Sequence, residues 1–311
     1  MAEALVANWQ GRRSLRRVTR IALLAGVLAL HAGYREARAD NWRIETKDGA
    51  RTAIVRPAAK GPAPTLVVLH GATISADLTV RWSGFAEAAA ARGFAAVFPE
   101  GIYKLWNDNR GDGISSSDDV GFLRTLNKQL IERGVADPER IYIAGISNGG
   151  MMTLRMLCEA PELYAGAATV IANMPAGAGA TCRLKKPMPV VMFNGTADPL
   201  IPYEGGGVGL MGSRGTVWAT ERTADFIAQA NGCSGQAEPA TVGPPSGDRI
   251  KVKRIEWTGC GPGRAVTLYR VEGGGHQLFG HTNILPMIFG PGTSQVLAPE
   301  IIVAMFAGER R

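Results

Sequence analysis

Short apolar segments alternate with amphipathic segments along most of the chain. Runs of aliphatic and aromatic residues predict buried strands at 65–69, 94–98, 140–144, 165–171, 190–193 and 266–271. Between these runs, apolar residues at helical spacing predict helices at 83–92, 118–130, 151–158, 217–230 and 296–306. The alternation of strand and helix favours an α/β fold with a doubly wound, mostly parallel sheet. Residues 42–55 alternate around a turn and predict an additional hairpin ahead of this sheet.

The first 39 residues have the pattern of an export signal. Basic residues (Arg12, Arg13, Arg16, Arg17 and Arg20) precede an apolar stretch, and Ala37-Arg38-Ala39 offers a small-residue cleavage site. The apolar stretch, residues 21–30, is shorter than the roughly 20 residues that a bilayer span requires, which disfavours an uncut membrane anchor. We expect cleavage after residue 39 and a secreted or periplasmic protein, exported by the general or the twin-arginine route. Residues 40–311 are then expected to form one catalytic domain without a large lid.

The positive charge of the chain is concentrated in this leader. The whole sequence has a formal net charge of +7, but residues 1–39 contain seven Arg and two Glu. The mature chain therefore carries only about +2, and its Lys and Arg residues are scattered. This balance argues against nucleic acid as a partner. The sequence predicts no particular oligomeric state.

Four cysteines, Cys158, Cys182, Cys233 and Cys260, all lie in the part expected to be exported. An even number in an oxidising compartment predicts two disulfides, for which three pairings are possible. We favour the sequential pairs, which close the shortest loops. A metal site is disfavoured because the spacings are far wider than Cys-x-x-Cys.

The segment Gly145-Ile146-Ser147-Asn148-Gly149 lies between an apolar run and a helix-like segment. A strand, a Gly-x-Ser-x-Gly turn and a helix in this order are typical of a nucleophile elbow, which holds its serine on a sharp turn. Glycine on each side leaves room for the crowded backbone. We therefore predict that Ser147 is a nucleophile rather than part of an ordinary glycine-serine loop.

A serine nucleophile needs a histidine that accepts its proton. In this arrangement the histidine follows the serine in the chain, so His276 and His281 qualify and His70 does not. His276 follows the strand at 266–271 through a run of glycines, at the carboxyl end where the base is expected. We predict His276 as the base, with His281 as the alternative.

The acid that orients this histidine is expected after the strand at 190–193. Asp198 lies on the loop that follows that strand and is the predicted acid. Glu204 and Asp225 are weaker alternatives, because the first lies further along the loop and the second lies in a predicted helix.

The oxyanion that develops during acyl transfer needs backbone donors. One predicted donor is the amide of Asn148, directly after the serine. The other is the amide of Ala72, in the turn after the strand at 65–69, where the Thr73 hydroxyl could assist. His70 begins this turn, and we interpret it as a structural residue.

Trp106, Tyr203, Trp218 and Phe279 lie on predicted loops at the same end of the sheet. They are candidates for lining an acyl or aryl pocket. The alternative for each is packing in the core or at its rim.

With these motifs placed, the chain resembles the polyhydroxybutyrate depolymerase-like esterases, a group that includes feruloyl and acetyl xylan esterases. Matching segments extend in order over most of the chain after the leader, at 67–71, 118–123, 145–152, 195–199, 202–206, 231–233 and 272–276. The resemblance implies an α/β-hydrolase fold, a triad of Ser147, Asp198 and His276, and the sequential disulfides. Members usually continue Gly-Gly-His with Thr-Trp-Pro-Gly, whereas Gln277-Leu278-Phe279-Gly280 follows here, which predicts a different pocket beside the base.

These observations together predict an exported serine carboxylesterase that acts through an acyl-enzyme and needs no metal or organic cofactor. Hydroxyalkanoate oligomers or polyester are the expected substrate, and feruloyl or acetyl esters of plant polysaccharide are the alternative. The same triad would also serve acyl transfer or peptide cleavage. A binding protein on a hydrolase scaffold is a further alternative, which the presence of all three triad residue types disfavours.

Overall fold

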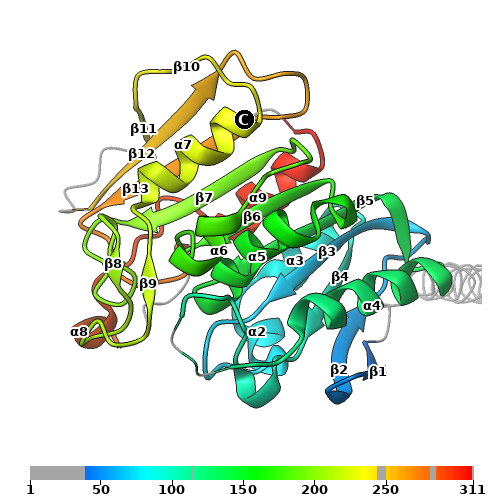
Figure 1. The fold of residues 1–311 in the computed structure, drawn as a ribbon. Coiled ribbons are helices and arrows are strands. Elements are labelled where there is room, and N and C mark those ends of the chain that lie inside the picture. The colour runs from blue at the N-terminus through cyan, green and yellow to red at the C-terminus, as the bar shows by residue number, and fades with distance from the viewer. Residues whose placement is uncertain (1–38, 112, 114, 244–249, 281–284, 310–311) are drawn as a thin grey trace, which may run out of the picture. The chain divides into compact units, whose positions relative to one another are not determined.

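A sheet of eleven strands forms the centre of the domain (Figure 1). The computed structural model describes residues 39–111, 113, 115–243, 250–280 and 285–309. The strands are β1 (Asp40–Thr46), β2 (Gly49–Arg56), β3 (Ala63–Leu69), β4 (Ala95–Pro99), β5 (Ala136–Ile146), β6 (Gly166–Val170), β7 (Val190–Gly195), β10 (Gly235–Gln236), β11 (Ala240–Val242), β12 (Lys251–Thr258) and β13 (Val266–Glu272). Their order is β1-β2-β4-β3-β5-β6-β7-β13-β12-β10, and β11 pairs with β12. The predicted leader lies outside the described residues up to Arg38, as does His281.

The middle of this sheet is parallel and its margins are antiparallel. All neighbours from β4 to β13 pair in parallel. The hairpin of β1 and β2 adds one antiparallel margin, and β12 with its partners adds the other. The doubly wound, mostly parallel sheet and its leading hairpin were both predicted, so these parts of the sequence analysis are confirmed.

Helices cover both faces of the sheet because the central strands are apolar on both sides. The helices are α2 (Ala76–Trp82), α3 (Phe85–Ala91), α4 (Asp119–Glu132), α5 (Asn148–Glu159), α6 (Ala176–Thr181), α7 (Thr220–Ala230), α8 (Pro286–Phe289) and α9 (Ala298–Phe306). In β3, Val67 and Leu69 pack in one buried cluster with α4, α5 and α7, whereas Leu66 and Val68 pack in another with α2, α3 and α9. The alternation within one strand thus assigns the helices to the two layers.

Three local features of the structure differ from the sequence analysis. The strand predicted at 140–144 begins earlier, because β5 starts at Ala136 and includes a stretch that leaves the register with β3 between Ala136 and Ile141. The seven-residue helix α2 was not predicted, because so short a segment offers little periodicity. The strand β12, which pairs with β13 on one side and with β10 and β11 on the other, was also missed, since it alternates charged with apolar residues irregularly.

Two disulfides close segments near the ends of helices. Cys158 is bonded to Cys182, and Cys233 is bonded to Cys260, so the favoured sequential pairing is confirmed. Within the described ranges, no helix has the length and apolar character that crossing a bilayer requires.

Candidate active site

Ser147 lies between β5 and α5 with backbone angles that few residues other than glycine adopt. Its φ is 54° and its ψ is −120°, which places it in the left-handed half of conformational space. The Ser147 amide donates to Val170 O of the next strand at 2.9 Å, so the turn is fixed from both sides. This geometry is that of a nucleophile elbow, and backbone strain of this kind is typical of functional sites.

The glycines around the elbow allow neighbouring backbone segments to pack closely. A Cβ on Gly145 would lie 2.1 Å from Gly149 O, and a Cβ on Gly149 would lie 2.4 Å from Leu69 O. Neither distance is sterically possible. Glycine therefore allows the first turn of α5 to lie directly on the end of β3, and it brings the Asn148 amide toward the turn after that strand.

Ser147, His276 and Asp198 form one chain of hydrogen bonds. The Ser147 hydroxyl lies 2.9 Å from His276 Nε2, within the 2.6–3.2 Å expected for a nucleophile and its base. His276 Nδ1 lies 2.7 Å from Asp198 Oδ2. With a neutral imidazole, Nδ1–H donates to the carboxylate and Nε2 accepts from the serine. The three side chains singled out from the sequence are thus brought together.

Asp198 is held for this task by its own loop. Its second oxygen, Oδ1, accepts from the amides of Leu200 at 2.8 Å and Ile201 at 2.9 Å, and the side chain is only 2% exposed. The aspartate therefore makes the turn contacts that are common for this residue type with one oxygen and meets the histidine with the other.

The histidine loop packs through glycine as well. A Cβ on Gly275 would lie 2.1 Å from Phe289 O, and one on Gly195 would lie 2.2 Å from Gly274 O. The His276 amide donates to Phe289 O at the end of α8. These contacts place the base over the carboxyl ends of β7 and β13, which bound the loops of Asp198 and His276.

The turn proposed for the second oxyanion donor lies against the serine. An ideal Cβ on Gly71 would be 3.6 Å from the Ser147 Cβ. His70, fully buried, holds this turn: its Nδ1 bonds Gly71 O at 2.8 Å and its Nε2 accepts from the Gly101 amide at 2.9 Å. Burial lowers the pKa of His70 to about 4, so the ring is neutral at pH 7. The structural interpretation of His70 is thereby supported.

A buried polar network behind this turn was not predicted. Arg51 Nη2 donates to Asp119 Oδ1 at 2.8 Å and to Glu100 O at 3.0 Å. Asp119 Oδ2 accepts from the Asn107 amide at 2.7 Å. Asp118 caps α4 by accepting from the Gly121 amide, as expected of an acid at a helix start, but the sequence offered no sign that the next acid is buried.

Three of the four proposed pocket aromatics are buried, which corrects that interpretation. Trp106 is 2% exposed, Phe279 is fully buried against α9, and Tyr203 is 7% exposed with its hydroxyl 3.0 Å from Glu221 Oε1. This burial fits packing in the core or at its rim, the alternative given for each of them. Trp218, partly exposed and edge-on to Phe226, and Thr73, exposed, remain candidates.

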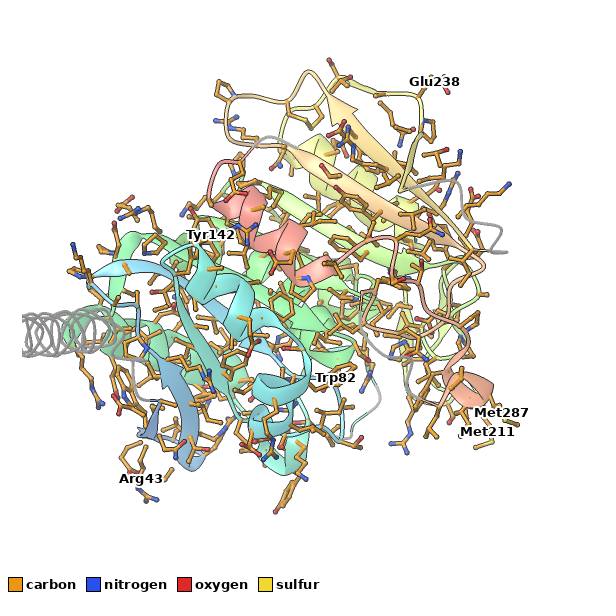
Figure 2. All side chains as sticks on the ribbon, turned by 180° about the vertical axis from the view of Figure 1, so that it is seen from behind. Arg43, Trp82, Tyr142, Met211, Glu238 and Met287 are labelled. Atoms are coloured by element: carbon orange, nitrogen blue, oxygen red, sulfur yellow. A yellow bond between two sulfur atoms is a disulfide. The ribbon has the colours of Figure 1, made fainter. Side chains whose placement is uncertain are left out.

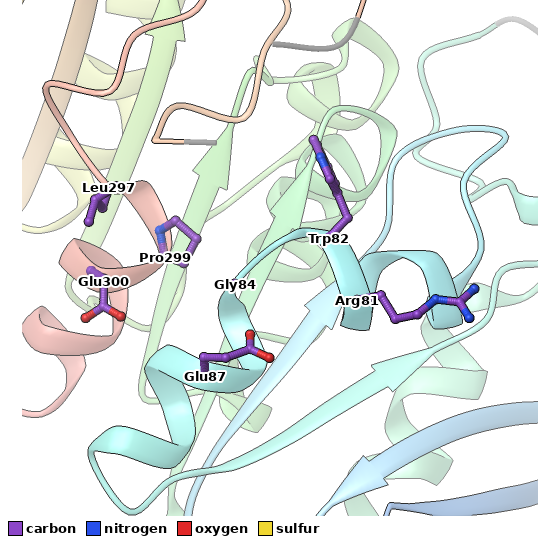
Figure 3. A pocket seen from close by; sticks show the side chains of 7 residues that line it. All are labelled: Arg81, Trp82, Gly84, Glu87, Leu297, Pro299 and Glu300. Atoms are coloured by element: carbon purple, nitrogen blue, oxygen red, sulfur yellow. The ribbon is translucent and has the colours of Figure 1, made fainter. Parts of the chain in front are cut away.

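The alternative acids point elsewhere. Asp225 accepts from Trp257 Nε1 at 3.0 Å, and Glu204 is exposed on its loop. A cavity of about 380 Å³ lies between α2, α3 and the start of α9, where Trp82, Glu87 and Glu300 line it (Figure 3), and no triad residue borders it. Within the described part of the chain, no group of His, Cys, Asp and Glu side chains could hold a metal ion.

The chain is similar in sequence to proteins named as esterases. The chain is 30% identical over 286 residues to a protein of Nocardia uniformis named "Putative esterase NocK", covering 86% of this chain and 79% of the relative. It is 29% identical to feruloyl esterase B of Piromyces equi over 69% of this chain, and it spans 39% of that relative's length. Acetylxylan esterase A of Emericella nidulans is 30% identical over 36% of this chain and 38% of its own length.

Two further comparisons concern the fold. The model of the prolyl oligopeptidase family matches residues 123–175, a segment that includes the serine turn. The solved acetyl xylan esterase from Aspergillus awamori superposes with a TM-score of 0.55 at 13% identity, covering 76% of this chain and 94% of that one. The fold is therefore that of the α/β-hydrolases.

Proposed function

The chain belongs to the α/β-hydrolase esterase family that includes NocK, and we propose that it is an exported serine carboxylesterase with Ser147, His276 and Asp198 as its triad. The observation that carries this proposal is the continuous path from Ser147 Oγ through His276 to Asp198, at 2.9 and 2.7 Å. The strained backbone of the serine supports it.

The proposed reaction has two halves. Ser147 attacks the ester carbonyl while His276 Nε2 takes its proton, and the resulting imidazolium is stabilised by Asp198. The amides of Asn148 and Ala72 donate to the oxyanion, and the N-terminus of α5 adds favourable dipole charge. His276 then returns the proton to the leaving alcohol, and water activated by the same histidine hydrolyses the acyl-enzyme.

Feruloyl or acetyl esters of plant polysaccharide are the substrate that the relatives favour. Feruloyl esterase B and acetylxylan esterase A are both among them. Hydroxyalkanoate oligomers, the first expectation from sequence, remain the second candidate because apolar side chains are exposed on α8, whose Phe289 O accepts from the His276 amide, and on the loop that follows Asp198. Met211 is 89% and Met287 is 99% exposed, and both are labelled at the same edge of the molecule in Figure 2.

Hydrolysis of esters is favoured over peptide cleavage or acyl transfer. The match to the prolyl oligopeptidase family ends at residue 175, before the predicted acid and base. A non-catalytic binding protein on a hydrolase scaffold is disfavoured because His276 lies within hydrogen-bonding distance of both Ser147 and Asp198. Export rests on the leader pattern and on the two disulfides, which suit an oxidising compartment.

The test compares the purified protein with its Ser147→Ala variant on methyl ferulate, acetylated xylo-oligosaccharide and a hydroxybutyrate oligomer. Released acids are quantified by mass spectrometry. We expect release from at least one ester and a fall in kcat of about 10⁶-fold in the variant. Equal rates for the two proteins would refute the nucleophile, and hydrolysis of the oligomer alone would select the second substrate class.

A further inference from the structure

We propose that Trp106 is a positioning residue that sets the separation between the two backbone donors of the oxyanion site. Asn148 and Ala72 are 76 positions apart in sequence. Asn148 is hydrogen-bonded to Trp106, and the turn that contains Ala72 is hydrogen-bonded to Trp106 through His70 O. This inference rests on the proposed esterase function. It concerns a residue that touches neither the triad nor the reacting ester.

The first link joins the main chain of Trp106 to the serine turn. Asn148 Oδ1 accepts from the Trp106 amide at 2.8 Å, and Asn148 Nδ2 donates to Trp106 O at 2.9 Å. The second Nδ2 hydrogen donates to Asp108 Oδ2 at 2.7 Å. Because Asn148 is only 1% exposed, these bonds have no competition from water. The residue that supplies one oxyanion amide therefore holds Trp106 with its side chain.

The second link joins the side chain of Trp106 to the other turn. The indole Nε1–H donates to His70 O at 3.0 Å, and the indole ring lies 5.0 Å from the His70 ring. His70 O belongs to the peptide group that precedes Gly71 and Ala72. On the far side of Ala72, the Thr73 amide donates to Lys104 O at 2.9 Å. The turn is thus bonded on both sides to the segment that carries Trp106.

The segment that contains Trp106 is itself anchored. The Asn107 amide donates to buried Asp119, which forms an ion pair with Arg51. The Trp106 ring stacks on the ring of Phe122 in α4, with 6.4 Å between the ring centroids. Trp106 therefore cannot move without disturbing β2 and α4. A displaced serine turn or a displaced Ala72 turn would have to break a bond to the same residue.

The consequence for catalysis is geometric. Oxyanion donors must lie 2.7–3.1 Å from the developing charge, and removing one donor costs about 10²- to 10³-fold in kcat. A shift of about 1 Å caused by a change away from the chemistry can cost about 10²-fold. Without its indole bond the His70 turn loses one of its fixed points, so Ala72 would present its amide less accurately.

The experiment compares Trp106→Phe with Trp257→Phe. Both changes keep an aromatic ring and delete an indole N–H that donates at 3.0 Å, to His70 O for Trp106 and to Asp225 Oδ1 for Trp257, and both tryptophans belong to the same apolar cluster. With active sites titrated, we expect Trp106→Phe to lower kcat about 10- to 100-fold at nearly constant KM, and Trp257→Phe to leave both unchanged. Affinity for a trifluoromethyl ketone, which forms a tetrahedral oxyanion on the serine, should fall by the same factor as kcat/KM. Affinity for the product acid should stay constant.

A merely structural role would lower the melting temperature of Trp106→Phe without changing kcat or ketone affinity per active site, and that result overturns the proposal. If Trp106→Phe does not fold, Asn148→Ala cuts the other link while keeping the amide, and the same kinetic signature is expected. Failure of both variants to fold, while Trp257→Phe folds, assigns the network to stability and also overturns it. An inactive wild-type protein would instead refute the esterase function.

Discussion

Two halves of the candidate active site are held by different kinds of contact. Both halves rely on glycine for close backbone packing, at Gly145 and Gly149 in one and at Gly195 and Gly275 in the other. The half that carries Ala72 and the serine turn is also fixed by buried polar bonds between residues far apart in sequence, among them the Arg51–Asp119 pair and the bonds of Trp106. The half that carries Asp198 and His276 is fixed within its own loops, by the bonds of Asp198 Oδ1 to the Leu200 and Ile201 amides and by a small apolar cluster that includes Ile201, Val208 and Val217. Its outer loops expose Leu210, Met211, Leu285 and Met287.

This difference in contacts suits the two halves to different tasks, binding of the oxyanion in one and selection of the substrate in the other. Donors for an oxyanion must meet the same charge in every ester, which favours a rigid network of buried polar bonds. If Asp198 and His276 act as we propose, their loops also lie beside the substrate, and we expect specificity to vary at the exposed apolar positions of these loops.

Asp198→Asn should lower kcat about 10⁴-fold, because the amide no longer accepts from His276 Nδ1–H and favours the wrong tautomer. Steady-state kinetics on the best ester measures this loss. Asp225→Asn is the matched control and is expected to keep the wild-type kcat. Retention of activity within tenfold in Asp198→Asn would show that this half needs no orienting acid.

Asp119→Ala should lower the free energy of unfolding by about 3–5 kcal/mol, since it leaves the Arg51 guanidinium buried without its partner. Urea unfolding measures the change. Glu45→Ala removes an equally short but exposed ion pair with Arg43 and should have no measurable effect. Similar values for the two variants would contradict the importance given to the buried network.

Stability should also fall as the pH drops from about 6.5 to about 4. Burial lowers the pKa of His70 from 6.5 to about 4, so the unfolded chain binds a proton in this window that the folded chain does not. The His70 contribution is complete above pH 6.5, and its loss by pH 4 amounts to about 3 kcal/mol. Burial raises the pKa of neighbouring Glu100, which opposes part of this trend.

Urea unfolding of the wild type and of His70→Gln at pH 7, 5 and 4 isolates the contribution of His70. The difference in the free energy of unfolding between the two proteins should shrink as the pH falls. A constant difference over this window would mean that His70 is not kept neutral by the polar half of the site.

Met287→Gln should change the melting temperature by less than about 1 °C, because the side chain is 99% exposed. Met156→Gln, at a fully buried position, should cause a clear fall. Thermal unfolding of the pair checks the claim that the outer loops add little to stability. A comparable fall for Met287→Gln would show that α8 is packed against a surface and would remove the contrast between the halves.

The sequence was sufficient to single out Ser147, Asp198 and His276, because their placement depends on local pattern. Glycine spacing around Ser147, and the position of Asp198 and His276 directly after apolar runs, indicate geometry because the carboxyl ends of parallel strands meet at one edge of a sheet. The backbone strain at the serine follows from the same motif.

The buried polar bonds beside the serine turn could not be predicted, because they join residues far apart in sequence. Trp106 is 36 positions from His70 and 42 from Asn148, and nothing in its neighbours indicates that both lie beside it. Asp119 matched an ordinary helix start, which concealed its pairing with Arg51. Aromatic residues on predicted loops were assigned to a pocket by position alone, and burial then moved Trp106, Tyr203 and Phe279 into packing roles.

Trapping the acyl-enzyme tests the central claim most directly. The protein is mixed with an ester that it hydrolyses and is quenched in acid during steady turnover. It is then digested and mapped by mass spectrometry beside Ser147→Ala. We predict an acyl group on the peptide that contains Ser147, at Ser147 itself, and none in the variant. An acyl group on another residue, or turnover by Ser147→Ala at the wild-type rate, would contradict the account.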